Sequence, residues 1–290
     1  MRHFCYRSFV LLKALASPLY VKLLLTMHGP KKENAMGQQT KMFEHLPFAT
    51  EQVIGSRARI GLVVLATDYT IEHEMRALIN LPGVDVFHAR IANSVNISTE
   101  TLQEMEPLIT ATAELILPGD DVDVLAYACT SASIVLGTEA VAKNLNAAKP
   151  GAKTTNPAFA AFNAFKVMGA ERIAVLTPYT KHLNHMVEAS IKEAGFQVPA
   201  FGSFNEPHDP TVAAINNQSL KSAIAKITNG HDIDAVFISC TSVRIASDVA
   251  AIESELGMPV TSSNHALAWH CMRLAGIDEK MPEMGSLFNL

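Results

Sequence analysis

Two cysteines lie in matching sequence contexts, each after an apolar run and before a Thr-Ser pair. Cys129 stands in LAYACTSASI and Cys240 in VFISCTSVRI. A thiol between a buried strand and a helix start meets unpaired main-chain N–H groups and the positive end of the helix dipole, which favour the thiolate. Two such thiols on opposite sides of a bound carbon can remove a proton from one face and return one to the other. Alternatively, one thiol can attack the substrate while the other donates a proton to it. This pattern predicts a two-thiol catalytic site that needs no metal and no cofactor. The alternative for each cysteine is an ordinary buried thiol, and the matched pair favours function.

Polar residues near the same strand ends are expected to complete the site. We expect the substrate to be bound by Asp68, Thr130, Ser131, Tyr179, Asp209, Thr241 and Ser242. The hydroxyl residues after each cysteine are suited to cap a helix and to hold a carboxylate. Asp68 either enters the site or caps the helix beginning near Thr70, whereas the Tyr179 phenol is expected to hydrogen-bond a carboxylate. Asp209 is either a helix N-cap, which we slightly favour, or a polar contact in the site.

The histidines give weaker signals. His182 and His185 are three residues apart on a predicted helix, but no third ligand is evident, so we expect an exposed helix face. His265 is expected to cap or pack at a helix start rather than assist a thiol. Cys271 is expected to lie in the core. No glycine-rich phosphate loop and no HExxH motif occurs in the sequence.

Alternating strand and helix patterns must position these residues. The predicted strands are 59–66, 84–91, 122–128, 172–178, 197–204 and 233–239, and the predicted helices are 70–80, 99–117, 131–148, 180–194, 211–229, 244–256 and 265–275. This rhythm is typical of βαβ units with a parallel sheet covered by helices. It predicts an α/β fold.

The pattern occurs twice. A shift of 111 positions places Cys129 on Cys240 and Asp68 on Tyr179, and the segment TTNPAFAAF (154–162) resembles SSNHALAWH (262–270). Internal duplication therefore predicts two pseudosymmetric parallel-sheet, Rossmann-like halves, with the active site in the cleft between them. We assign 57–156 plus 260–280 to the first half and 157–259 to the second.

Composition limits the other functions. The chain has 290 residues, 49% hydrophobic and 18% charged, with a formal net charge of -5 and no basic stripe, which argues against nucleic acid as a partner. Four scattered cysteines do not form a disulfide framework, so we expect a cytoplasmic protein with reduced thiols. Residues 1–56 are expected to be a poorly structured extension with no membrane span, and Met27 or Met36 could be the working initiator. The sequence leaves open whether the chain forms a homo-oligomer.

Over about residues 57–277 the sequence resembles the aspartate/glutamate racemase superfamily, within it the maleate isomerase and arylmalonate decarboxylase branch. YACTSAS and SCTS are similar to its two cysteine motifs, LTPY to the tyrosine motif of maleate isomerases, and TSSNHALAWHCMRLAGI to the closing segment, although the glycine-rich opening motif of aspartate racemases is missing. The resemblance implies that Cys129 attacks the double bond of maleate, that Cys240 protonates the adduct, and that rotation and elimination give fumarate. Arylmalonate decarboxylases keep only the second cysteine, so the presence of both argues against that activity.

Two positions depart from the maleate isomerase pattern. Asp68 and Asp209 stand where the resemblance implies asparagines. Carboxylates would repel a dicarboxylate but attract an ammonium group, which favours an amino acid or a related zwitterion. The ATDYT opening also resembles a branch associated with ectoine breakdown. We therefore expect a cofactor-independent isomerase of a small carboxylic acid, maleate isomerase-like. The alternatives are an amino-acid racemase and a non-catalytic two-lobed binding protein.

Overall fold

The computed structural model describes residues 40–290, and expectations for Cys5, Met27 and Met36 fall outside this range. Residues 40–53 contain no helix or strand and are exposed. Glu51–Leu290 form one compact unit. No helix within residues 40–290 is both long and apolar enough to cross a membrane.

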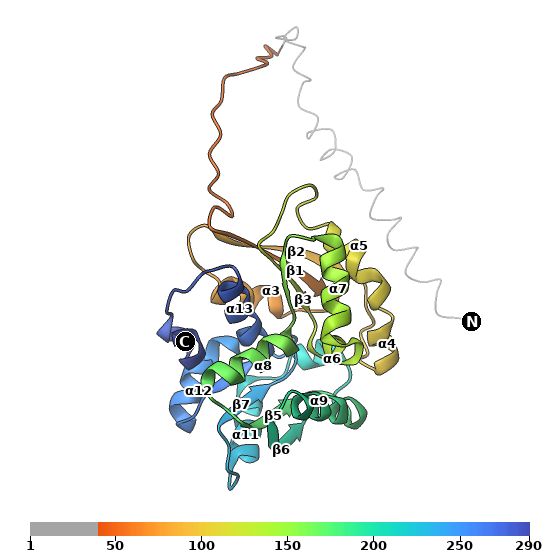
Figure 1. Cartoon of the computed structure of the whole chain (residues 1–290), viewed down its shortest axis with the longest axis vertical. Helices are drawn as coiled ribbons and strands as arrows, with labels where there is room; N and C mark the ends of the chain where they lie inside the picture. Colours follow the sequence, from red (N-terminus) through yellow and green to blue (C-terminus); the bar gives the residue numbers. More distant parts are fainter. Residues whose placement is uncertain (1–39) are drawn as a thin grey trace, which may run out of the picture. The chain divides into compact units, whose positions relative to one another are not determined.

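Two four-stranded parallel sheets form the framework of this unit (Figure 1). The first has the order β2-β1-β3-β4, formed by β1 (Ala58–Leu65), β2 (Val84–Ile91), β3 (Val124–Ala128) and β4 (Lys153–Thr155). The second repeats it as β6-β5-β7-β8, formed by β5 (Arg172–Thr177), β6 (Gln197–Ser203), β7 (Ala235–Ile238) and β8 (Val260–Ser262). Every residue of β3 and β7 is buried, as expected for central strands covered on both faces. The predicted α/β fold with two pseudosymmetric sheets is confirmed.

A carboxylate arrangement repeats at the amino end of each sheet. Asp123 accepts a hydrogen bond from the main-chain N–H of Arg59 at 2.7 Å, and Asp234 accepts one from that of Arg172 at 2.8 Å. Each aspartate thereby joins the central strand of its sheet to the neighbouring strand. The matched aspartates of the duplication are thus structural and lie at the amino ends of the strands, away from the cysteines.

Helices connect the strands. They are α3 (Ile71–Leu78), α4 (Thr99–Gln103), α5 (Ile109–Glu114), α6 (Thr130–Leu136), α7 (Thr138–Ala148), α8 (Pro157–Met168), α9 (Lys181–Glu193), α10 (Asp209–Ala213), α11 (Asn217–Thr228), α12 (Val249–Leu256) and α13 (Ser263–Leu274). Several predicted single helices are interrupted. Gly137, with φ of 88°, separates α6 from α7, and Pro107 in a 3-10 turn separates α4 from α5. Asn216 begins α11 by accepting the main-chain N–H of Ser219 at 2.8 Å.

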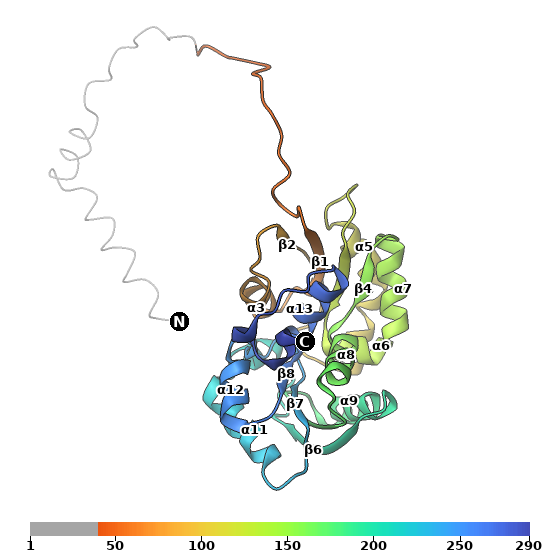
Figure 2. The same ribbon diagram turned by 60° about the vertical axis from the view of Figure 1, so that its left-hand side comes forward.

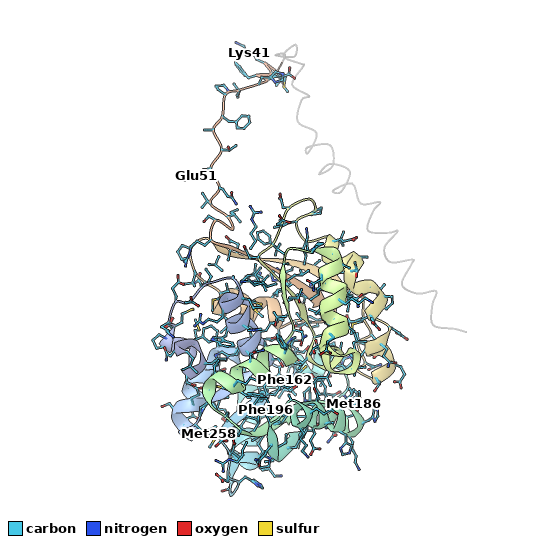
Figure 3. All side chains as sticks on the ribbon, in the orientation of Figure 1. Lys41, Glu51, Phe162, Met186, Phe196 and Met258 are labelled. Carbon is cyan, nitrogen blue, oxygen red and sulfur yellow. The ribbon has the colours of Figure 1, made fainter. Side chains whose placement is uncertain are left out.

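The two halves exchange a helix. α8 follows a strand of the first sheet but packs on the second, where the Phe165 ring lies 5.1 Å from Phe196 and 5.5 Å from Phe237. Figure 3 shows Phe162 and Phe196 in the same cluster. α13 follows β8 of the second sheet yet packs against α3 and β4 of the first, and α8 and α13 lie side by side (Figure 2). Residues 260–262, which we assigned to the first half together with α13, pair with β7 in the second sheet.

Candidate active site

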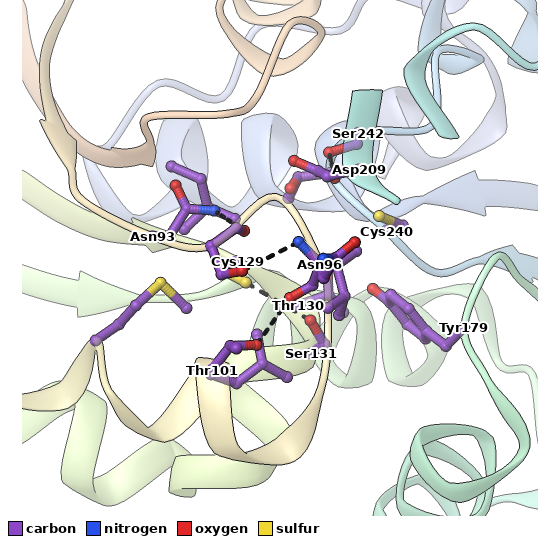
Figure 4. A pocket seen from close by; sticks show the side chains of 16 residues that line it. Asn93, Asn96, Thr101, Cys129, Thr130, Ser131, Tyr179, Asp209, Cys240 and Ser242 are labelled. Carbon is purple, nitrogen blue, oxygen red and sulfur yellow. Dashed lines mark hydrogen bonds between the residues drawn. The ribbon is translucent and has the colours of Figure 1, made fainter. Parts of the chain in front are cut away.

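A small cavity lies where the carboxyl ends of β1, β3, β5 and β7 meet (Figure 4). Both Cys129 and Cys240 line it. Six of the seven predicted binding residues also line it: Thr130, Ser131, Tyr179, Asp209, Thr241 and Ser242. Its volume is about 20 Å³, which is enough for a water molecule but not for a carboxylic acid. The cavity must therefore widen before a substrate can enter.

Cys129 occupies the N-cap position of α6, without a capping hydrogen bond from its side chain, and is 2% exposed. Its Sγ lies 3.7 Å from the hydroxyl of Ser131. Burial raises the pKa of the Cys129 thiol to about 12, although the Ala132 N–H and the Ser131 hydroxyl act in the opposite direction. In this small cavity, which we call the contracted cavity, the expectation that the position of Cys129 favours the thiolate is wrong. The loss of solvent raises the pKa of the thiol by more than the helix terminus lowers it.

Cys240 has a different surrounding. No helix begins directly after it, because residues 241–243 form a turn and the next helical residue is Ala246, in a 3-10 helix. The main-chain N–H groups of Ile245 and Ala246 instead donate to Glu74 of α3, both at 2.7 Å. Burial raises the pKa of the Cys240 thiol, and the charge of Asp209 raises it further. The prediction that both cysteines precede a helix is thus correct only for Cys129.

Ser263, which the sequence did not single out, connects the two cysteine loops. Its hydroxyl oxygen accepts from the main-chain N–H of Cys240 at 3.0 Å and from the Thr130 hydroxyl at 2.8 Å. Ser263 is completely buried at the first turn of α13. The string SSN (262–264), in the second copy of the repeated segment, is the sequence signal that could have indicated Ser263.

Tyr179 follows β5 and is 1% exposed. Burial raises the pKa of its phenol well above the ordinary value, and the phenol interacts with Cys240 and with Ser131 across the two halves. It is therefore a neutral group that can donate a hydrogen bond to a ligand carboxylate.

Asp68 does not line the cavity, although it is buried beside the cavity-lining residues. One carboxylate oxygen, Oδ1, accepts the main-chain N–H groups of Thr70 at 2.7 Å and Ile71 at 2.9 Å, so the residue caps α3. The other oxygen is buried and has no hydrogen-bond partner. Burial raises the pKa of this carboxyl and the charge of Asp209 adds to the increase, which the two N–H groups and the Thr241 hydroxyl only partly oppose.

Asp209 is a polar contact of the site and not the N-cap of α10. His208 occupies the N-cap position, and Asp209 is the first helical residue. The Asp209 carboxylate accepts from the hydroxyls of Thr67 at 2.6 Å and Ser242 at 2.5 Å, and the bond from Thr67 joins the two halves. The slightly favoured capping interpretation is therefore wrong, because both oxygens are turned toward the cavity wall.

Two equivalent loops meet beside the cavity. The loop after β2 and the loop after β6 form an antiparallel bridge between Asn96 and His208. The main-chain N–H of Ile97 donates to Pro207, and that of Asp209 donates to Val95, both at 2.9 Å. Asn93, Asn96 and Thr101 of the first loop and α4 also line the cavity, and none of the three was predicted from the sequence.

The histidines lie outside this cavity. His182 and His185 are exposed on α9. His265 is buried, where its ring contacts the Thr261 hydroxyl and the Met284 carbonyl, and burial lowers its pKa to about 4. Cys271 is buried within α13. Across residues 40–290, no three acidic, histidine or cysteine side chains come together as a metal site.

Known proteins are similar to this chain over most of its length. A sequence profile described as arylmalonate decarboxylase matches residues 60–288. Maleate isomerase of Pseudomonas putida is 28% identical over 244 residues, 80% of this chain and 97% of that protein. The Nocardia farcinica enzyme is 29% identical over 242 residues, 79% of this chain and 94% of that protein. A solved structure of a cysteine-to-serine mutant of Nocardia farcinica maleate cis-trans isomerase, with a covalently bound succinylcysteine intermediate, is 25% identical with a TM-score of 0.72 and covers 80% of this chain and 98% of that one. Because the profile spans both sheets and both cysteine loops, the chain belongs to the arylmalonate decarboxylase family.

Proposed function

We propose that the protein is a cofactor-independent isomerase of a small carboxylic acid, in which Cys129 and Cys240 act on opposite sides of the substrate. The observation that carries the proposal is that two thiols from equivalent strand ends of the two sheets line one cavity. The similarity to maleate isomerases, one of them with a succinylcysteine, supports cysteine chemistry at this place.

Cis–trans isomerisation is the first route. The Cys129 thiolate attacks one alkene carbon, the π electrons take the proton of the Cys240 thiol at the other carbon, and a single bond remains between them. After rotation, the Cys240 thiolate removes a proton from that carbon, the double bond re-forms, and the C–S bond breaks to release Cys129.

Racemisation is the second route that the same geometry allows. One thiolate takes the proton from the carbon next to a carboxylate, and the other thiol donates its proton to the opposite face. Both routes need one thiolate and one thiol. Because both thiols have raised pKa values in the contracted cavity, the bound substrate must help to form the thiolate.

The neutral donors around the cavity are suited to the substrate carboxylate. The Tyr179 phenol and the hydroxyls of Ser131 and Thr241 lie in the cavity wall. Hydrogen bonds from such groups stabilise the negative charge that develops when a proton leaves the adjacent carbon. These residues are therefore proposed to bind the carboxylate and the enolate-like transition state.

The test is turnover of maleate, D- and L-aspartate and D- and L-diaminobutyrate in heavy water, followed by chiral chromatography and mass spectrometry. Deuterium at the α-carbon of an inverted product identifies racemisation, and a succinyl-type adduct on Cys129 identifies isomerisation. Cys129→Ser and Cys240→Ser are each expected to reduce turnover by about 10²- to 10⁴-fold, whereas Cys271→Ala, which changes a buried thiol outside the cavity, is the matched control. Wild-type turnover in both serine variants would refute the two-thiol mechanism.

A further inference from the structure

The cavity contains a buried carboxyl group but no cationic side chain. Asp209 lines it and is 1% exposed, and none of the lining residues is a lysine, arginine or histidine. Within residues 40–290, no ion pair includes Asp209 or Asp68. Arg90 donates to the main-chain carbonyl of Asp68 and pairs with Glu72. A buried carboxylate without a counter-charge is unfavourable, so this wall of the cavity lacks a positive partner.

The hydrogen-bond directions show that Asp209 acts as an acceptor. The Asn93 side-chain oxygen accepts from the main-chain N–H of Thr67, which leaves the Asn93 amide nitrogen to donate to the Thr67 hydroxyl at 2.8 Å. The single Thr67 hydroxyl proton therefore points to Asp209. Each Asp209 oxygen then receives one hydroxyl and keeps capacity to accept a further donor from a ligand.

A second acidic group strengthens this acceptor character. The unpartnered oxygen of Asp68 is buried beside the same loops, and the charges of Asp68 and Asp209 both raise the pKa values of the two thiols. In the view of Figure 4, Asp209 and Ser242 lie toward one end of the cavity, whereas Ser131 and Tyr179, the neutral donors, lie toward the other. The end with Asp209 thus suits a positively charged group of a ligand, and the end with the neutral donors suits a negatively charged one.

We infer that the substrate is a small carboxylic acid that carries an ammonium group, and that Asp209 binds this group while the neutral hydroxyls bind the carboxylate. The inference rests on the proposed function, because it concerns the substrate of the same cavity. Asp209 is then the residue that selects an acid with an ammonium group over one without it.

An ammonium group at this position also has a consequence for the thiols. Its positive charge offsets the carboxylates of Asp209 and Asp68, which otherwise oppose thiolate formation. The substrate itself therefore lowers the pKa of the thiol that must act as base or nucleophile. A dicarboxylate of the same size would raise it.

The first experiment measures the affinity of the full chain for three acids that differ in charge. Maleate has no ammonium group, aspartate has one, and diaminobutyrate has two but lacks the second carboxylate. We expect isothermal titration to show at least ~10-fold tighter binding of aspartate or diaminobutyrate than of maleate, the range of a hydrogen bond between charged groups. Equal or tighter binding of maleate would overturn the inference.

The second experiment uses Asp209→Asn, which keeps the shape of the side chain and removes its charge. The variant is expected to bind the ammonium-bearing acid about 10- to 100-fold more weakly, with maleate binding unchanged or tighter. Asp121→Asn removes an exposed aspartate outside the cavity lining and serves as the charge-matched control. An unchanged preference in a folded Asp209→Asn protein would refute the role of Asp209.

The outcomes separate this inference from the proposed function. Cysteine-dependent turnover of maleate without any preference for ammonium would retain the isomerase and remove the zwitterion. Asp209-dependent binding of an amino acid with no cysteine-dependent turnover would retain the binding role of Asp209 and remove the isomerase. Thiol alkylation adds an independent readout, since a bound ammonium-bearing acid is expected to shift the pH profile of Cys129 toward lower pH in the Cys240→Ser variant, and maleate is not.

Discussion

The two cysteine loops occupy equivalent places in two equivalent sheets, yet their surroundings differ. Cys129 occupies the N-cap position of α6, and its sulfur is near a main-chain N–H group and a serine hydroxyl. Cys240 is followed by a turn, and after burial the charge of Asp209 is the largest influence on the pKa of its thiol, opposed by the Tyr179 phenol and the Ser242 N–H. Asp209 and Asp68 also raise the pKa of the Cys129 thiol, but they weigh less there than the Ala132 N–H and the Ser131 hydroxyl. Duplication has therefore preserved the positions of the two sulfurs and the kinds of groups around them, but Asp209 weighs more on Cys240 than on Cys129.

This difference suggests distinct roles for the two thiols. A helix terminus supports a sulfur that becomes negatively charged, whereas neighbouring carboxylates keep a thiol protonated. The framework favours Cys129 as the nucleophile or base and Cys240 as the proton donor. The following experiments test this asymmetry.

The largest expected effects come from the cysteines themselves. Cys129→Ser and Cys240→Ser should each reduce kcat by about 10²- to 10⁴-fold, the range for loss of a positioned acid or base. If the roles differ, adducts should accumulate with an alkene substrate only in the Cys240 variant, as mass spectrometry of the intact protein would show. Because the two thiols act as a unit, the kcat of the double variant should be only a little lower than that of the less active single variant. Equal adduct levels in both single variants would contradict the asymmetry.

Glu74 provides the next effect, on stability and its pH dependence. It is buried beneath the Cys240 loop, where burial raises its pKa to about 7. The protonated form is favoured by folding, so its stabilising contribution is complete below about pH 4.5 and is lost as the pH rises through 7. The loss should approach about 2–3 kcal/mol.

Urea unfolding of the wild type and Glu74→Gln between pH 4.5 and 8 measures this effect. The glutamine variant should show a smaller decrease in the free energy of unfolding over that range. The duplication offers a control, because the residue equivalent to Glu74 in the second half is the exposed His185. His185→Gln should show the same pH dependence of the free energy of unfolding as the wild type. Parallel profiles for the wild type and Glu74→Gln would argue against a raised pKa of Glu74.

Ser263 is expected to have a smaller effect on stability. Ser263→Ala leaves the buried N–H of Cys240 without a partner, which should cost about 1–3 kcal/mol. The equivalent position in the first copy is Thr155, whose hydroxyl contacts His270 and neither cysteine loop. Thr155→Val should therefore destabilise the fold without changing the pH profile of Cys240 alkylation, whereas Ser263→Ala should change both. An unaltered alkylation profile in Ser263→Ala would limit this residue to a packing role.

The smallest expected effect concerns the helix break found only after Cys129. Gly137 has φ of 88° and space for a side chain, since nothing lies within 4 Å of an added Cβ. Gly137→Ala should lower the free energy of unfolding by about 1–2 kcal/mol through backbone strain alone. Thermal unfolding would measure it, and a stabilised variant would indicate that α6 and α7 can fuse.

Many elements could be predicted from local patterns. The strand 84–91 and the helix predicted over 180–194 match the structure because apolar periodicity is a local signal. The interrupted helices were missed, since Gly137 within a continuous apolar pattern gives little warning of a break. The part of the site formed by Asn93 and Ser263 was also missed, because neither follows a cysteine motif.

The sequence by itself determined that two equivalent strand, cysteine and hydroxyl segments exist, because the apolar periodicity and the 111-residue shift depend only on the order of residues. Only the tertiary structure decided that both thiols are desolvated, that Cys240 lacks a following helix, and that Asp209 faces a cavity without a cation. The physical reason is that burial and Coulomb interactions depend on which distant segments fold against each cysteine, and these differ between the two copies.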